Sequence, residues 1–300
     1  MRKDDYSTVS DRAERGVDLG HHCLTGARSS FSITAPGRFR AVQRAVGRVA
    51  QVAFEYQHPY PPPGVRERYP FVSAPQVDRS DDEMLAIARA FHAEMDARRS
   101  VRSISDRPVP RELIELAIAT ASTAPSGAHM QPWTFVAISD PDLKHRIRMA
   151  AEAEEHTNYV GERMNDEWQR ALGPLGTDEH KEFLDAAPWL VVLFEQRFGV
   201  NPDGSRRHHY YVKESVGIAA GMFITAIHRM GLVTLTHTPT PMAFLSKLLG
   251  RPDHERPFIL FPVGHPMPDA VVPDLHRKPL DEVMVVHADP TADRSATPQP

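Results

Sequence analysis

The longest apolar run of the chain sets the strongest limit on its fold. It extends from Gly217 to Ile227 and is followed directly by His228 and Arg229. With 11 residues it is too short to cross a bilayer as a helix, which takes roughly 20 residues. It predicts a helix over about 211–230 that is buried on all sides, in a core or an oligomer interface, and that ends at Gly231.

Composition and charge exclude several classes of protein. The chain has 300 residues and a net charge of −4, whereas nucleic-acid-binding proteins are normally basic. Its single cysteine, Cys23, excludes an intramolecular disulfide framework and a cysteine-rich metal site. The pairs His21-His22 and His208-His209 lack metal-ligand spacing, so we expect no metal. The absence of Gly-x-Gly-x-x-Gly and Walker motifs disfavours a Rossmann or P-loop site.

The two ends of the chain differ from its middle. Residues 1–80 contain 12 Lys and Arg against 8 Asp and Glu, and a Tyr60-Pro61-Pro62-Pro63-Gly64 run. We expect a largely disordered extension over 1–80, one α+β domain over 81–287 and a disordered tail over 288–300. The N-terminus lacks the apolar segment of a secretory signal, so we expect a cytoplasmic protein without a membrane span.

Apolar periodicity places the elements of this domain. The first helix begins near 82, the second at Pro110, and the third at Pro141 after the capping residue Asp140. Gly173-Pro174-Leu175-Gly176 interrupts the helical segment that follows. Further helices are expected over 178–186 and 241–249, and strands over 133–138, 190–194, 232–236 and 258–263.

A cluster of arginines offers a candidate binding site. It reads Arg98-Arg99-Ser100-Val101-Arg102, and guanidinium groups bind phosphate through paired hydrogen bonds. The alternative is a set of solvated cations at a helix C-terminus, where the helix dipole favours them. Spacing alone leaves both interpretations open.

Three further segments carry candidate residues. The loop Pro125-Ser126-Gly127-Ala128-His129 has small residues that let a planar ligand approach the backbone, although it also resembles a plain turn. Thr234, Thr236 and Thr238 end a predicted strand. Glu155 and Tyr159 share one face of a predicted helix and, with Lys181, could bind an amino-acid zwitterion, or could be ordinary surface charges.

Together these segments resemble the nitroreductase superfamily of FMN flavoproteins and, within it, the iodotyrosine deiodinase branch. The resemblance covers about residues 82–287, and the Glu155, Tyr159 and Lys181 set points to that branch. The matching segments are 98–102, 123–129, 132–135, 155–159, 181–185, 209–211, 231–234 and 273–281.

The resemblance implies FMN as cofactor and assigns residues to it. Arg98, Arg99 and Arg277 would bind its phosphate and ribityl chain, with help from Ser100 and the adjacent Val101. Arg102 would reach the pyrimidine edge of the flavin, and Ser126 would contact the cofactor from its loop. The isoalloxazine ring would lie against Thr236, His237 and Thr238, with the Thr238 hydroxyl near N5 as the catalytic group.

The resemblance also implies the substrate and the assembly. The Ala128 backbone amide would bind a phenolate oxygen, Glu155 the ammonium group and Lys181 the carboxylate of a halotyrosine, with Tyr159 bridging them. The fold would be a central, mostly antiparallel sheet flanked by helices, in an intertwined homodimer with FMN at the subunit interface.

The implied activity is reductive dehalogenation of halogenated tyrosines, with electrons from NADPH directly or through a flavin reductase. The alternatives are a general nitro or quinone reductase and a flavin-binding protein without turnover. This chain departs from the family pattern at His237, where a small hydroxyl residue is expected, at Met130-Gln131, and at the Gly173–Gly176 break in the lid segment.

Overall fold

The computed structural model describes residues 56–58, 60–161 and 163–288 of the chain. The chain divides into two units, Met1–Gln76 and Val77–Pro300. Most of the expected extension, residues 1–55, and nearly all of the expected tail, residues 289–300, lie outside the described residues. In the first unit, the described residues include a turn in which the Val65 amide donates to the Pro62 carbonyl at 3.2 Å.

A four-stranded antiparallel sheet forms the centre of the second unit. Its strand order is β1-β2-β6-β5, and every pairing in it is antiparallel. β1 is Trp133–Ile138, β2 is Trp189–Gln196, β6 is Glu255–Gly264 and β5 is Val233–Thr234. The expected antiparallel sheet is thereby confirmed, with β2 and β6 as its inner strands.

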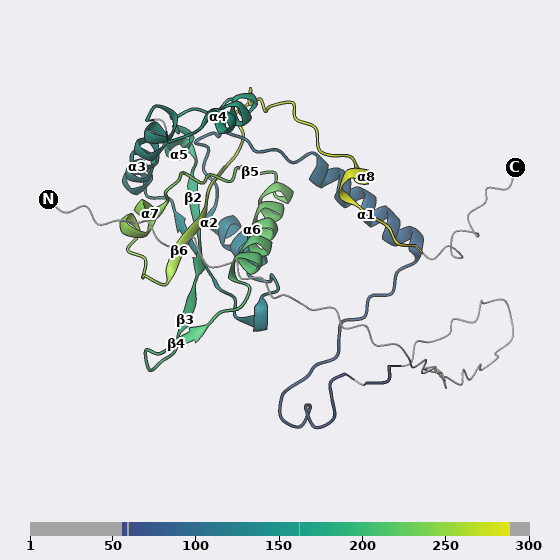
Figure 1. The fold of residues 1–300 in the computed structure, drawn as a ribbon. Coiled ribbons are helices and arrows are strands. Elements are labelled where there is room, and N and C mark those ends of the chain that lie inside the picture. The colour runs from purple at the N-terminus through teal and green to yellow at the C-terminus, as the bar shows by residue number, and fades with distance from the viewer. Residues whose placement is uncertain (1–55, 59, 162, 289–300) are drawn as a thin grey trace, which may run out of the picture. The chain divides into compact units, whose positions relative to one another are not determined.

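Helices cover both faces of this sheet (Figure 1). Alternate residues of β2 face opposite sides. Val191 and Leu193 pack with α2 (Arg111–Ala121) and α6 (Val212–Arg229). Leu190 and Val192 pack with α3 (Pro141–Tyr159), α5 (Phe183–Ala186) and α7 (Ala243–Leu248). The unit is a three-layer arrangement with a core on each side of the sheet.

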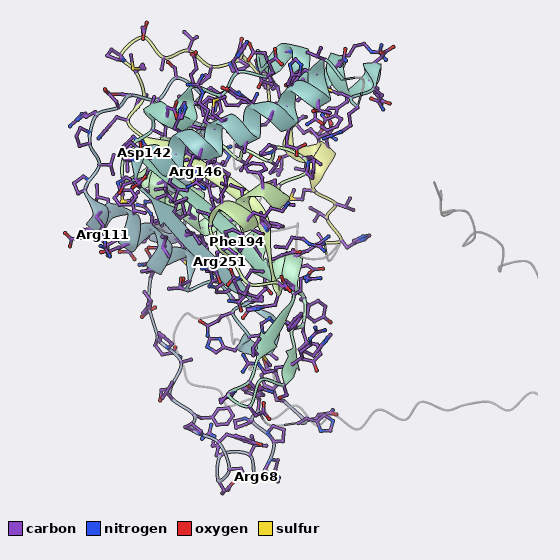
Figure 2. The ribbon with its side chains drawn as sticks, turned by 90° about the vertical axis from the view of Figure 1, so that its left-hand side faces the viewer. Arg68, Arg111, Asp142, Arg146, Phe194 and Arg251 are labelled. Atoms are coloured by element: carbon purple, nitrogen blue, oxygen red, sulfur yellow. The ribbon has the colours of Figure 1, made fainter. Side chains whose placement is uncertain are left out.

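The N-terminal end of β6 is held by a polar cluster. The Arg251 guanidinium donates to both carboxylate oxygens of Glu255, at 2.7 and 3.0 Å, and lies 6.0 Å from the centroid of the Phe194 ring (Figure 2). The Thr134 hydroxyl donates to Glu255 Oε1 at 2.6 Å. These bonds join the ends of β1 and β6 across β2.

Helix α6 is buried on one side only in a single chain, so a core that surrounds the helix is excluded, and burial in an oligomer interface stays a prediction. Val216, Ala219, Phe223 and Ile227 are buried against α2 and the sheet. The opposite side is open, because Ile218 is 46% exposed and its neighbours Gly217 and Gly221 are also exposed. None of the helices formed by the described residues combines the length and apolarity needed to cross a membrane.

The structure also corrects the expected helix over 178–186. Only α5 (Phe183–Ala186) is helical there. Before α5, carboxylate side chains accept hydrogen bonds from the backbone amides. Asp178 Oδ1 accepts from the His180 amide at 2.9 Å, and Glu152 Oε1 accepts from the Lys181 amide at 2.7 Å. These bonds replace those of a helix, so Lys181 lies on an irregular segment.

Two other regions differ from the prediction. The expected strand 232–236 is reduced to β5, after which a single bridge pairs His237 with Leu260. A hairpin that the periodicity did not indicate is formed by β3 (Phe198–Val200) and β4 (Arg206–His208).

Further helices are α1, α4, η2 and α8. Helix α1 (Asp81–Asp96) begins with a capping box formed by Ser80 and Glu83 and buries no residue in the described chain. Helix α4 (Asp166–Leu172) runs into the short helix η2 (Gly173–Leu175), and Gly176 then turns the chain with a φ of 58°. Helix α8 is Leu280–Val283.

A short helix, η1 (Gly127–His129), packs closely on the start of α6. The Gly127 amide donates to Ser215 Oγ at 3.3 Å, and the Ser215 hydroxyl donates to the Tyr211 carbonyl at 2.6 Å. A methyl group on Gly127 would lie 2.6 Å from the Tyr210 carbonyl oxygen. Glycine is therefore required here by close approach of two backbones.

We predict that Gly127→Ala lowers the free energy of unfolding by about 1–3 kcal/mol, because the loop must move away from Tyr210. The matched control is Gly173→Ala, where an added methyl group meets nothing within 4 Å. Its helical backbone before Pro174 is unfavourable for alanine, but no backbone has to move, so the loss should be smaller than for Gly127→Ala. Urea unfolding of both variants measures the difference. A Gly127→Ala protein as stable as the wild type would contradict this packing.

Candidate functional site

The candidate phosphate-binding arginines converge at the C-terminal end of α1. Arg277 donates to the Asp96 carbonyl at 2.9 Å, to Asp96 Oδ1 at 2.8 Å and to the Arg98 carbonyl at 2.9 Å. Arg99 donates to the same two carbonyls, at 2.5 and 3.0 Å. The tertiary structure therefore brings Arg277 beside Arg98 and Arg99, as expected.

The charges of this cluster favour an anion. Burial lowers the pKa of Arg98, and the positive charges of Arg277 and Arg99 lower it further. Three neighbouring guanidinium groups repel one another, and a phosphate group would relieve the repulsion through charge-assisted bonds. A cavity of about 260 Å³ beside the cluster is lined by Arg98, Arg99, Ile227 and His228 among others. This donor set fits the phosphate end of a nucleotide cofactor.

Val101 connects the cluster to the sheet. Its side chain is buried, and its amide donates to the Thr234 carbonyl at 3.3 Å. Ser100 before it is exposed and Arg102 after it is partly buried. The positive charge of Arg102 lowers the pKa of Tyr159, Lys181 and His237. Arg102 therefore lies near these three residues, which form a second group of candidate site residues.

The segment after β5 exposes and buries its side chains alternately. Thr236 and Thr238 are exposed, whereas His237 is buried. The His237 amide donates to the Leu260 carbonyl at 2.9 Å, and the Leu260 amide donates back at 3.0 Å. The two threonines are therefore presented on the side of this segment opposite His237.

His237 is held as a neutral imidazole. Burial, followed by the positive charges of Lys181 and Arg102, lowers its pKa to about 3. Its ring lies edge-on to Phe183, with 5.8 Å between centroids. Its Nε2 atom is buried and has no hydrogen-bond partner among the described residues.

The predicted zwitterion-binding residues also lie together. Glu155 and Tyr159 lie about one turn apart on α3. The Lys181 ammonium lies 5.5 Å from the centroid of the Tyr159 ring. Lys181 Nζ donates to the Asp178 carbonyl and, at 3.3 Å, to Thr177 Oγ1. Tyr159 lies in the same group, since Glu155 and Arg102 both influence its pKa.

Both charged residues of this group are buried at a cost. Glu155 is 9% exposed and Lys181 is 3% exposed. Burial raises the pKa of Glu155 and lowers that of Lys181, and their mutual attraction only partly opposes these shifts. A ligand that carries an ammonium and a carboxylate group would offer each of them an opposite charge. The interpretation as ordinary solvated surface charges is therefore wrong for Glu155 and Lys181.

The loop with Ser126 and Ala128 is backbone-strained. Ala128, His129 and Gln131 have φ angles of 48°, 55° and 48°, a region that non-glycine residues rarely occupy. Ser126 Oγ accepts from the Gln131 amide at 2.9 Å and closes the loop. Such strain is typical of ligand-binding loops, and exposed Ala128 presents its backbone outward.

These groups lie at opposite ends of α6. The Ser126–Ala128 loop bonds to Ser215 and lies close to the Tyr210 backbone at the N-terminal end of α6. The arginine cluster lies at its C-terminal end, where His228 Nε2 donates to the Glu94 carbonyl at 2.8 Å. An 18-residue helix is about 27 Å long. A single chain therefore keeps the loop away from the arginines.

Sequence reasoning missed the residues that support the site. Asn158 is buried and donates to the Thr240 carbonyl at 3.1 Å, and Ser215 holds the loop. Ser215 did carry a signal, as a polar residue beside the apolar run of α6. No group of three or more metal-ligating side chains occurs in the part of the chain that the structure describes.

Known proteins resemble this chain over the same region. The nitroreductase family model matches residues 95–265. An iodotyrosine deiodinase of Haliscomenobacter hydrossis is 56% identical over 206 residues, which are 69% of this chain and 92% of that protein. The human iodotyrosine deiodinase 1 is 48% identical over 206 residues, 68% of this chain and 71% of that protein.

A solved structure agrees with these relatives. It is an oxidised iodotyrosine deiodinase bound to FMN and 3-iodo-L-tyrosine, with a TM-score of 0.57 and 27% identity over 66% of this chain and 98% of that one. The resemblance expected from the sequence is thereby confirmed. This chain belongs to the nitroreductase family and, within it, to the group of the iodotyrosine deiodinases.

Proposed function

We propose that the protein is an FMN-dependent reductive dehalogenase of halogenated tyrosines. The observation that carries the proposal is the buried group of Glu155, Tyr159 and Lys181, whose two opposite charges match those of an amino acid. A general nitro or quinone reductase would not need this group. The relatives named iodotyrosine deiodinase support the same activity.

The residues that the family resemblance assigns to FMN fit this cofactor. Arg98, Arg99 and Arg277 would hold its phosphate, with Ser100 and Val101 beside them. Thr236 and Thr238 are exposed on one side of their segment, where a flat ring can lie, and Ser126 would contribute from its loop. When bound and reduced, FMN would supply the two electrons and a proton that exchange the carbon–halogen bond for a carbon–hydrogen bond and release halide. We propose NADPH as the source of these electrons, directly or through a flavin reductase.

The chain's own residues would prepare the substrate for this reaction. Glu155 would bind the substrate ammonium and Lys181 the substrate carboxylate, with Tyr159 between them. These contacts would fix the position of the substrate's aromatic ring. The Ala128 amide would bind the phenolate oxygen and stabilise its negative charge. Arg102 would stabilise negative charge at the pyrimidine edge of the flavin, and the Thr238 hydroxyl would donate at N5.

A homodimer would complete this site. The loop with Ser126 and Ala128 lies at the far end of α6 from the arginines, so one chain cannot place both on one cofactor. The open side of α6 around Ile218 offers an apolar surface, and antiparallel packing of two α6 helices would bring each loop to the partner's arginines. Helix α1 also exposes Met84, Leu85, Ile87 and Phe91, which a second chain would cover.

We predict that the protein sediments at twice the mass of one chain and that Ile218→Asp converts it to a monomer with weakened FMN binding, since a buried unpaired charge is unfavourable. Met149→Asp is the matched control, because Met149 is 52% exposed on α3 in the other helix layer. Analytical ultracentrifugation distinguishes the species. A monomeric wild-type protein that binds FMN would contradict the shared site.

We predict that Arg98→Ala combined with Arg99→Ala weakens FMN binding by roughly a hundredfold or more, since two charge-assisted bonds are lost. The matched control is Arg111→Ala combined with Arg146→Ala, which removes the same charge from exposed positions on α2 and α3 (Figure 2). Flavin fluorescence during titration of the apoprotein measures both affinities. Equal affinity in the two double variants would contradict the phosphate site.

We predict that Glu155→Gln and Lys181→Gln each weaken diiodotyrosine binding by roughly tenfold to a hundredfold, because each removes a charge-assisted bond of about 1.5–3 kcal/mol. FMN affinity should not change. Quenching of flavin fluorescence gives the affinities, and iodide release after reduction with dithionite gives the activity.

Substrates without the amino-acid backbone are the control. A halophenol should be a poor substrate of the wild type and nearly indifferent to both substitutions. Nitroaromatic turnover without iodide release would indicate a general reductase, and reducible flavin without turnover would indicate a flavin carrier.

A further inference from the structure

The zwitterion group combines one rigid element with one irregular segment. Glu155 and Tyr159 are fixed by α3. Lys181 lies between η2 and α5, outside any helix or strand. Nothing in the regular backbone holds Lys181 at a set distance from Glu155, so another contact has to do so.

Glu152 provides this contact. It lies three residues before Glu155 and seven before Tyr159, on the same side of α3. Its Oε1 atom accepts from the Lys181 backbone amide at 2.7 Å. The Leu184 amide donates to the Lys181 carbonyl at 2.9 Å. The Lys181 backbone is therefore held from both sides, once by α3 and once by α5.

Arg148 fixes the Glu152 carboxylate in turn. Its Nε donates to the same Oε1 atom at 2.8 Å, and its NH1 group donates to Asp185 Oδ2 at 2.9 Å. The side chains of Arg148 and Glu152 are only 21% and 17% exposed. The Arg148 guanidinium therefore links α3 to both ends of the segment 181–185, to Asp185 directly and to Lys181 through Glu152.

Glu152 remains ionised in this environment. Burial opposes its charge, but the Lys181 amide and the Arg148 guanidinium outweigh burial and lower its pKa. A charged acceptor binds an amide more strongly than a neutral one. The contact to Lys181 is therefore a strong one and does not depend on the bound substrate.

We propose that Glu152 is a positioning residue that selects amino-acid substrates, by setting the spacing between the Lys181 ammonium and the Glu155 carboxylate. This inference rests on the proposed function, and it adds a residue that touches neither substrate nor cofactor. Without Glu152, the charges of the group remain but their spacing is no longer fixed. Binding of the zwitterion should suffer, and binding of a halophenol should not.

The experiment compares Glu152→Ala, Glu152→Gln and Glu182→Gln. Glu182 is the matched control, because it adjoins Lys181 and lies 3.7 Å from Arg148, yet its side chain is 80% exposed. The substrates are 3-iodotyrosine and 2-iodophenol, with dithionite as reductant. The readout is the ratio of the two kcat/KM values, split into KM and kcat.

We expect Glu152→Ala to lower this ratio by roughly tenfold through a higher KM for iodotyrosine, as for the loss of one charge-assisted bond. Glu152→Gln keeps an acceptor oxygen and should rescue part of the loss. Glu182→Gln should keep the wild-type ratio. Hydrogen exchange of the ligand-free protein should become faster across residues 177–183 in Glu152→Ala alone.

The contrary outcomes are distinct. If both substrates lose activity equally, or if the ratio and the hydrogen exchange of Glu152→Ala match the wild type, the positioning role is overturned and the proposed function stands. If the wild type itself shows no preference for iodotyrosine, the proposed function fails, and the positioning role fails with it.

Discussion

Burial of strand β2 on both faces is the constraint on which the second unit depends. Its run from Leu190 to Phe194 is fully buried, so each face of the sheet needs its own helix layer. One layer is built around α6 and the other around α3. The two layers then carry the two halves of the site. The loop and the arginines adjoin the ends of α6, and the zwitterion group belongs to α3 and the segment before α5.

The one-sided burial of α6 has a direct consequence for chemistry. A helix of this length separates the Ser126–Ala128 loop from Arg98 and Arg99 by more than a flavin ring system spans. The exposed surface around Ile218 and the split site are therefore two aspects of one arrangement. Both would be explained by the proposed homodimer, in which a second chain covers α6 and contributes its loop.

Electrostatics gives the site its selectivity for charged ligands. Three guanidiniums lie together at the end of α1, and a carboxylate and an ammonium are buried together between α3 and the segment 177–182. Each set is more stable with a ligand of opposite charge than without one. The two sets match a phosphate and an amino acid, which are the two charged parts of the proposed cofactor and substrate.

Local residue chemistry determined much of this protein from the sequence by itself. Asp140 and Pro141 marked the start of α3, Gly173–Gly176 marked the break after α4, and short runs of apolar residues marked β1 and β2. The arginine cluster and the Glu155 face were visible because their members are near neighbours in the chain. Only the tertiary structure brought Arg277 to Asp96 and His237 to Phe183, since those contacts join residues far apart in sequence. It also decided that Lys181 lies outside a helix, because the Glu152 carboxylate on α3 accepts from its amide. It decided that α6 keeps one side open, because none of the elements formed by the described residues covers that side.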